Sequence, residues 1–216
     1  MKKLSFLFSI ASMIVLTSCE KVIGEGPLVN ETRTTGNFTG LESELSANIA
    51  YVQGNDYKVE LTAQQNVLNI METPVVNNKL IVRFKNNVHV KSHEQITIRV
   101  TAPSISSIGA SGSGNVNVLS PLSSNDLSFR LSGSGNISIA GGTATTENLK
   151  ISGSGNIDAQ NVSAKSVITT TSGSGVMKVN ASETLDVTIS GSGSVYYWGT
   201  PAVNTNISGS GKVIRR

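Results

Sequence analysis

Apolar and polar residues alternate with a period of two along most of the chain. Between residue 36 and about residue 103, five segments alternate or run apolar and are rich in β-branched residues: 41–52, 57–62, 67–71, 80–84 and 95–100. Glycine, proline and asparagine turn signals separate these segments, so each one is predicted to be a β-strand. No stretch after residue 19 sustains a helical stripe for three turns. The chain is therefore predicted to be all-β.

The second half of the chain is a repeat. Six copies of Ser-Gly-Ser-Gly begin at Ser111, Ser132, Ser152, Ser172, Ser190 and Ser208, in steps of 21, 20, 20, 18 and 18 residues. Such a period is typical of architectures in which each unit buries its apolar face only against its neighbours.

Alternation continues on both sides of each copy. Two residues before the first glycine stand Ala110, Leu131, Ile151, Thr171, Ile189 and Ile207, of which all but the threonine are apolar. Two residues after the last glycine stand Val116, Ile137, Ile157, Met177, Val195 and Val213, all apolar. Inward positions thus keep their register from copy to copy, and glycine allows a tight bend and a close approach of stacked backbones. We predict a parallel β-helix or two-sheet β-superhelix of about 20-residue repeats with Gly-Ser-Gly corners.

The first nineteen residues resemble an export signal. Lys2 and Lys3 precede an apolar stretch over residues 4–16, which is too short for a membrane span of roughly 20 residues. The following Leu-Thr-Ser-Cys resembles a bacterial lipobox, which implies cleavage before Cys19 and lipidation of its thiol. Several acyl chains would anchor the protein durably, because each buried methylene contributes about 0.8 kcal/mol. The alternative is an ordinary signal peptide that happens to contain a cysteine.

The chain is therefore divided into three parts. Residues 1–18 are predicted to be a lipoprotein signal peptide. Residues 19–35 contain glycine and proline without a period and are predicted to be a lipid-anchored tether. Residues 36–216 are predicted to form a single β-helical domain, with irregular N-terminal strands over 36–108 and the Ser-Gly-Ser-Gly repeats over 109–216.

Charge and composition exclude some partners. Without Lys2 and Lys3, 15 basic residues face 14 acidic ones, and no basic block indicates nucleic acid. Charged residues make up 14% of the chain, against roughly 25% in typical globular domains. Serine, threonine and asparagine must therefore supply most of the polar groups at the surface. The membrane is an expected partner, because the lipid anchor would attach the protein to it.

The repeats resemble a known family. Ser-Gly-Ser-Gly-Asn-Ile at residues 132–137 and 152–157, and Asn-Phe-Thr-Gly-Leu at residues 37–41, are similar to the head GIN domain family, autotransporter-type adhesin lipoproteins of Bacteroidetes. The resemblance implies a β-helical body related to pectin-lyase-like folds, a role in cell adhesion and no recognised catalytic residues. Val176, Ser194 and Lys212 stand where the repeat would have asparagine. An asparagine ladder is therefore not expected beyond the third copy.

Signals for catalysis or metal binding are sparse. The Ser-Gly-Ser-Gly copies precede predicted strands, whereas a phosphate-binding loop precedes a helix. His89 and His93 would lie roughly 13 Å apart in an extended segment, too far to share a metal. The repeat half has no histidine, and its acids are widely spaced: Asp126, Glu147, Asp158, Glu183 and Asp186. We predict no enzyme, no cofactor and no metal, although acids distant in sequence could still meet in space.

One aromatic cluster is a candidate ligand contact. Alternation directs Tyr197 inward and Tyr196 and Trp198 outward, where they could stack on a sugar or anchor a protein. The alternative is that the cluster caps the last coils.

We predict a non-catalytic lipoprotein of the outer membrane, on its periplasmic face or at the cell surface. It is expected to be an adhesin or interaction module for a host or bacterial surface glycan or protein. One alternative is a carbohydrate-binding or carbohydrate-degrading β-helix protein. Another is a structural component of the outer membrane that assembles with itself as a homo-oligomer.

Overall fold

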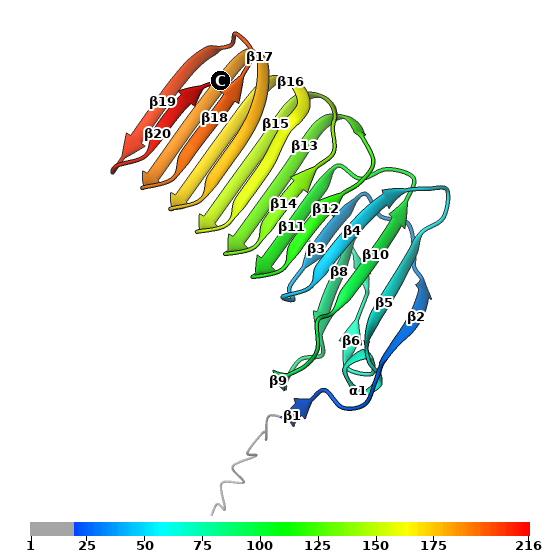
Figure 1. Ribbon diagram of the computed structural model, residues 1–216. Coiled ribbons are helices and arrows are strands. Elements are labelled where there is room, and N and C mark those ends of the chain that lie inside the picture. The colour runs from blue at the N-terminus through cyan, green and yellow to red at the C-terminus, as the bar shows by residue number, and fades with distance from the viewer. Residues whose placement is uncertain (1–19) are drawn as a thin grey trace, which may run out of the picture.

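The computed structural model describes residues 20–216, so the export signal and Cys19 lie outside the described residues. The protein is all-β, a β-solenoid of about 5 turns with repeats of about 20 residues. In Figure 1 the coils are stacked side by side, from the green strands to the red ones at the C-terminus. The predicted fold class is confirmed.

Each coil contributes one strand segment to each of two faces. Face 1 contains β11 (Ser107–Gly112), β13 (Leu122–Gly133), β15 (Gly142–Gly153), the later parts of β16 (Asn156–Gly173) and β17 (Val176–Gly191), and β19 (Ala202–Ser208). Face 2 contains β12 (Asn115–Val118), β14 (Asn136–Ile139), the early parts of β16 and β17, β18 (Ser194–Trp198) and β20 (Lys212–Arg215). Neighbouring segments of both faces pair in parallel.

Each Ser-Gly-Ser-Gly copy, called a junction below, links face 1 to face 2. The first glycine of every junction has a positive φ, between 92° and 125°, which favours glycine. The carbonyl of Gly112 accepts hydrogen bonds from the N–H groups of Ser134 (3.0 Å) and Gly135 (3.2 Å) in the next junction. A Cβ added at Gly135 would overlap the carbonyl oxygen of Gly114. The junctions are thus hydrogen-bonded from coil to coil at a distance that excludes a side chain.

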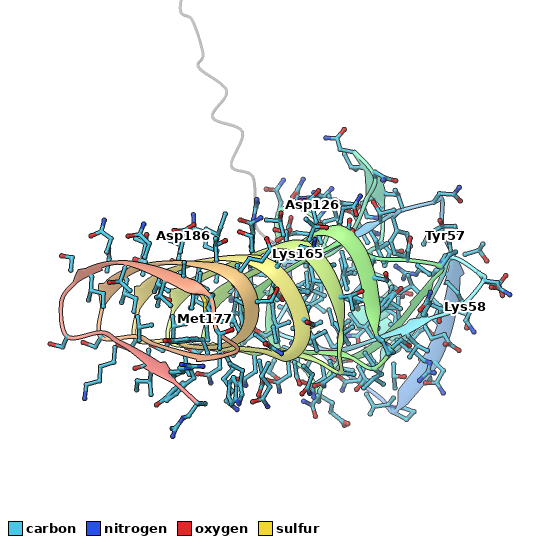
Figure 2. The ribbon with its side chains drawn as sticks, turned by 90° about the horizontal axis from the view of Figure 1, so that it is seen from above. Tyr57, Lys58, Asp126, Lys165, Met177 and Asp186 are labelled. Carbon is cyan, nitrogen blue, oxygen red and sulfur yellow. The ribbon has the colours of Figure 1, made fainter. Side chains whose placement is uncertain are left out.

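The core lies between the two faces. The predicted inward positions after each junction are buried in the first five copies, from Val116 to Val195, and Val213 is partly buried. Figure 2 shows Met177 inside the coils, whereas Asp126 and Asp186 project from the outside. Of the positions before the junctions, only Ile207 is exposed. It lies in β19, which pairs with β17 alone within residues 20–216.

An asparagine ladder runs along face 2. The side-chain amide of Asn136 donates to Asn115 at 2.7 Å, and that of Asn156 donates to Asn136 at 2.8 Å. Asn115 in turn donates to Asn48 at 3.3 Å. The ladder ends before Val176, as predicted. Its first member, Asn48, lies outside the repeats and was not predicted.

The N-terminal strands continue the solenoid and then close it. On face 1, β3 (Gly40–Ser43) pairs in parallel with β11 and with β8 (Lys79–Phe84). On face 2, β4 (Asn48–Gln53) pairs in parallel with β12 and with β10 (Thr97–Ala102). Beyond them, β5 (Lys58–Gln64) and β2 (Leu28–Thr34) are antiparallel additions, as are the short β6 (Met71–Glu72) and β7 (Val75–Val76) on β8.

Two segments differ from the expectation. The segment predicted as a tether contains β1 (Glu20–Ile23), which pairs with β9 (Val88–Ser92), as well as β2. No residue of β2 is fully buried. Its sequence therefore lacks the alternating apolar residues by which a strand is recognised. Residues 67–71, predicted as a strand, instead overlap the helical turn α1 (Gln65–Leu68). Val67 and Leu68 are adjacent and both fully buried, which an alternating strand does not allow.

The close approach of the junctions predicts that Gly135→Val destabilises the protein by at least about 2 kcal/mol, because overpacking alone typically costs 1–3 kcal/mol. Gly36→Val is the matched control, since a Cβ there has nothing within 4 Å. Denaturant unfolding of both variants measures the difference. Equal stability of Gly135→Val and the wild type would refute close packing at the junctions.

The ladder predicts that Asn136→Ala lowers the free energy of unfolding by about 1–2 kcal/mol, because it removes two hydrogen bonds. The control is Ser138→Ala on the same strand, an exposed residue whose hydroxyl has no hydrogen bond among the described residues. It should change stability by less than about 0.5 kcal/mol. A similar effect of both substitutions in thermal unfolding would show that the ladder contributes nothing specific.

Candidate functional site

The outer surface of face 1 is a set of polar columns in register. Three columns cross β13, β15, β16, β17 and β19: Ser128, Asn148, Ile168, Asp186 and Asn204; Arg130, Lys150, Thr170, Thr188 and Asn206; Ser132, Ser152, Ser172, Ser190 and Ser208. Within a column, neighbours are about 4.8 Å apart. In-register parallel pairing therefore converts the sequence repeat into a surface of mostly hydroxyl and amide groups.

An open groove crosses this surface at its N-terminal end. Its main part has a volume of about 380 Å³ and is lined by Glu42, Ala110, Ser111, Arg130, Leu131, Ser132, Lys150 and Ser152. Two smaller hollows of about 250 and 240 Å³ adjoin it, and Arg130 lines all three. Together they extend across the strands from Lys79 on β8 to Thr170 on β16.

The charged residues of the main part of the groove belong to one column. Along it, Glu42 on β3 is followed by Gly109 on β11, Arg130 on β13 and Lys150 on β15. A Cβ added at Gly109 would overlap the Glu42 carboxylate, so this glycine leaves room for the acidic side chain. Within residues 20–216, neither Arg130 nor Lys150 has a carboxylate oxygen within 4.0 Å. The main part of the groove therefore presents two cations without a carboxylate partner beside one carboxylate.

Sequence reasoning missed this groove. Arg130 and Lys150 are 20 residues apart, and only the period of the repeat brings them onto adjacent strands. The available signal was their shared position, two residues before the first serine of successive junctions. Glu42 joins them because β3 pairs with β11, which no repeat predicts.

The aromatic cluster lies on face 2 and is only half-buried. As predicted, Tyr197 packs against the core. Tyr196 lies between Lys178 and Ile214 in the ladder, and the Arg216 guanidinium is 4.9 Å from the centroid of its ring. One ring face of Tyr196 is therefore covered by a cation. A ligand contact at Tyr196 or Trp198 stays a prediction.

The remaining candidates are dispersed. His89 is exposed on β9, and the ring of His93 lies edge-on to Phe84 at 6.2 Å. Two acids of the repeat half pair with lysines, Asp158 with Lys178 at 2.8 Å and Glu183 with Lys165 at 3.8 Å. The described part of the chain holds no group of three or more His, Cys, Asp or Glu suited to a metal ion. Among residues 20–216 no helix has the length and apolar character needed to cross a membrane.

Among the residues whose burial is described, Glu147 is the one acid enclosed in the core. It occupies an inward position on β15, between Leu127 and Val167 of the neighbouring strands, and is fully buried. Neither carboxylate oxygen has a hydrogen-bond partner among the described residues. Burial raises the pKa of Glu147 to about 8, because desolvation disfavours the charged form. Glu147 is two residues before Leu149 and four before Ile151, so the period-two pattern of the sequence already places it on the inward side of the strand.

The fold defines the protein as an all-β solenoid. Residues 37–201 match the family described as "Putative auto-transporter adhesin, head GIN domain", and the chain belongs to this family. The resemblance inferred from the repeats is thereby confirmed. No curated protein matches the chain.

Solved structures share the fold. A putative adhesin from Bacteroides fragilis NCTC 9343 is 22% identical, with 90% of this chain and 100% of that chain covered and a TM-score of 0.73. A putative lipid binding protein from Parabacteroides distasonis ATCC 8503 is 19% identical, with 91% and 100% covered and a TM-score of 0.66. A putative adhesin from Parabacteroides merdae ATCC 43184 is 21% identical, with 91% and 99% covered and a TM-score of 0.58.

Glu147 predicts an unusual pH dependence of stability. Between its ordinary pKa of 4.5 and the raised pKa of about 8, the unfolded chain is deprotonated at this site and the folded protein is not. Stability should therefore fall as pH rises through this window, by up to about 1.4 kcal/mol per pH unit. Glu147→Leu, which matches Leu127 in the same column, should remove the fall and stabilise the protein at pH 8. Denaturant unfolding at pH 5 to 8 measures the slope.

The control for this prediction is Glu183→Leu, the same substitution at a side chain that is 63% exposed. It should leave the slope unchanged. A wild-type stability that is constant from pH 5 to 8 would refute a neutral buried carboxyl.

Proposed function

We propose that the protein is an adhesin, exported and anchored by lipidated Cys19 to the outer membrane. In this proposal the outer surface of face 1 contacts a glycan or protein on another surface. The observation that carries the proposal is the set of in-register polar columns from Ser128 to Ser208. Membership of an adhesin family supports it.

The physical character of face 1 suits adhesion. Serine, threonine and asparagine side chains are short, so they lose little conformational entropy when a ligand orders them. The strands beneath them, except the terminal β19, are paired on both sides, which keeps the columns rigid. Each contact is weak, but many copies anchored in one membrane bind together, and their combined avidity exceeds the affinity of one copy by orders of magnitude.

The proposed role is non-catalytic. Among the acids of the repeat half, Asp158 and Glu183 pair with lysines, Asp186 contacts the Asn204 amide at 3.3 Å, and Glu147 lies inside the core. Asp126 lies opposite Thr146 on the neighbouring strand β15, and not opposite another acid. General acid–base catalysis of sugar hydrolysis requires two carboxyl groups across one substrate.

The test uses cells that express the full chain and cells that express Cys19→Ala. Wild-type cells should adhere to a mucin-coated surface, and external protease should remove both the protein and the adhesion. Cys19→Ala cells should release the protein from the membrane fraction and should not adhere. Adhesion that is equal in cells without the protein, or that survives its complete proteolysis, would refute the proposal.

A further inference from the structure

We propose that the groove over Gly109, between Glu42, Arg130 and Lys150, binds a carboxylated oligosaccharide. This inference rests on the proposed adhesive function and names its ligand class. Its starting point is the pair of adjacent cations on β13 and β15, which have no internal carboxylate partner within 4.0 Å among residues 20–216.

The two cations fit a carboxylate. Arg130 and Lys150 occupy the same position on neighbouring strands, so their backbones are about 4.8 Å apart and both heads reach one anionic group. The planar guanidinium donates two parallel hydrogen bonds to a carboxylate, and the ammonium adds a point charge. Since both side chains are exposed, an incoming anion meets them without rearrangement of the core.

The rest of the groove fits sugar hydroxyls. Ser111, Ser132 and Ser152 line it in a row with one hydroxyl on each strand, and each hydroxyl both donates and accepts hydrogen bonds. Across Gly109, the Glu42 carboxylate is an acceptor for further hydroxyl donors. In the adjoining hollow, Ile168 is 39% exposed and offers an apolar contact to the C–H face of a sugar ring.

An acidic peptide fits less well. Peptides that bind to sheets usually add a strand at an edge, where backbone groups are free. Here β13 is paired with β11 on one side and β15 on the other, so the floor of the groove has no free backbone groups to offer.

The experiment titrates oligogalacturonate into the full chain, purified in detergent micelles, and follows binding by calorimetry. Arg130→Ala and Lys150→Ala should each weaken binding about tenfold, the range of one charge-assisted hydrogen bond, and the double variant should abolish it. Galactose oligomers, which lack the carboxylates, should bind at least tenfold more weakly. Thermal unfolding confirms that each variant is folded.

The matched control is Lys85→Ala/Lys91→Ala, which removes the same charge from two exposed residues outside the groove. It should change the affinity by less than twofold. Wild-type affinity in the Arg130→Ala/Lys150→Ala variant would overturn the site. Equal affinity for oligogalacturonate and for a glutamate oligomer would overturn the ligand class.

The two proposals fail separately. If cells with the double variant still adhere to mucin and the purified variant still binds oligogalacturonate, the groove assignment is overturned and the adhesive function stands. If wild-type cells do not adhere while purified protein loses oligogalacturonate binding on substitution, the adhesive function fails and the groove remains a saccharide site.

Discussion

The structure depends on the in-register stacking of coils at the junctions. The junctions that begin at Ser132, Ser152, Ser172 and Ser190 donate backbone hydrogen bonds to carbonyls of the preceding junction, as Ser134 and Gly135 do to Gly112. This spacing leaves no volume for a Cβ at the second glycine. Because the glycines hold successive coils at the distance of a parallel ladder, the side chains before and after them must superimpose from coil to coil. The apolar core and the polar columns of face 1 are both consequences of that register.

The same register determines what each substitution between copies does. Asparagine at 115, 136 and 156 forms a hydrogen-bonded ladder, and valine at 176 ends it. Arginine at 130 and lysine at 150 form a pair of cations where the later coils have Thr170, Thr188 and Asn206. Glutamate at 147 places a neutral carboxyl in a column of leucine and valine. In a stacked repeat, each side chain therefore lies between the equivalent side chains of the coils before and after it. The sequence of those two coils tells which groups a substituted residue will meet.

The N-terminal end of the solenoid is covered by antiparallel strands, whereas the repeats pair in parallel. Antiparallel β5 covers the edge strand β10, and antiparallel β2 covers β5 in turn. Antiparallel pairing suits such a cover because short connections suffice. Arg33 of β2 donates to the carbonyls of Leu68 and Met71 at 3.0 and 2.9 Å, which ties α1 to that cover. Edge strands that are covered in this way are protected from pairing with other chains.

The sequence by itself determined the all-β class, the solenoid and the inward positions of the repeats, because alternation and a fixed period act through neighbouring residues and neighbouring coils. It also predicted where the asparagine ladder ends. The strands β1 and β2 and the turn α1 were decided by tertiary packing, since neither β2 nor α1 carries a period-two apolar face. Only the tertiary structure brought Glu42 into the column of Arg130 and Lys150. The reason is that β3 joins the repeats by pairing with residues 67 positions away in the sequence, which no local pattern encodes.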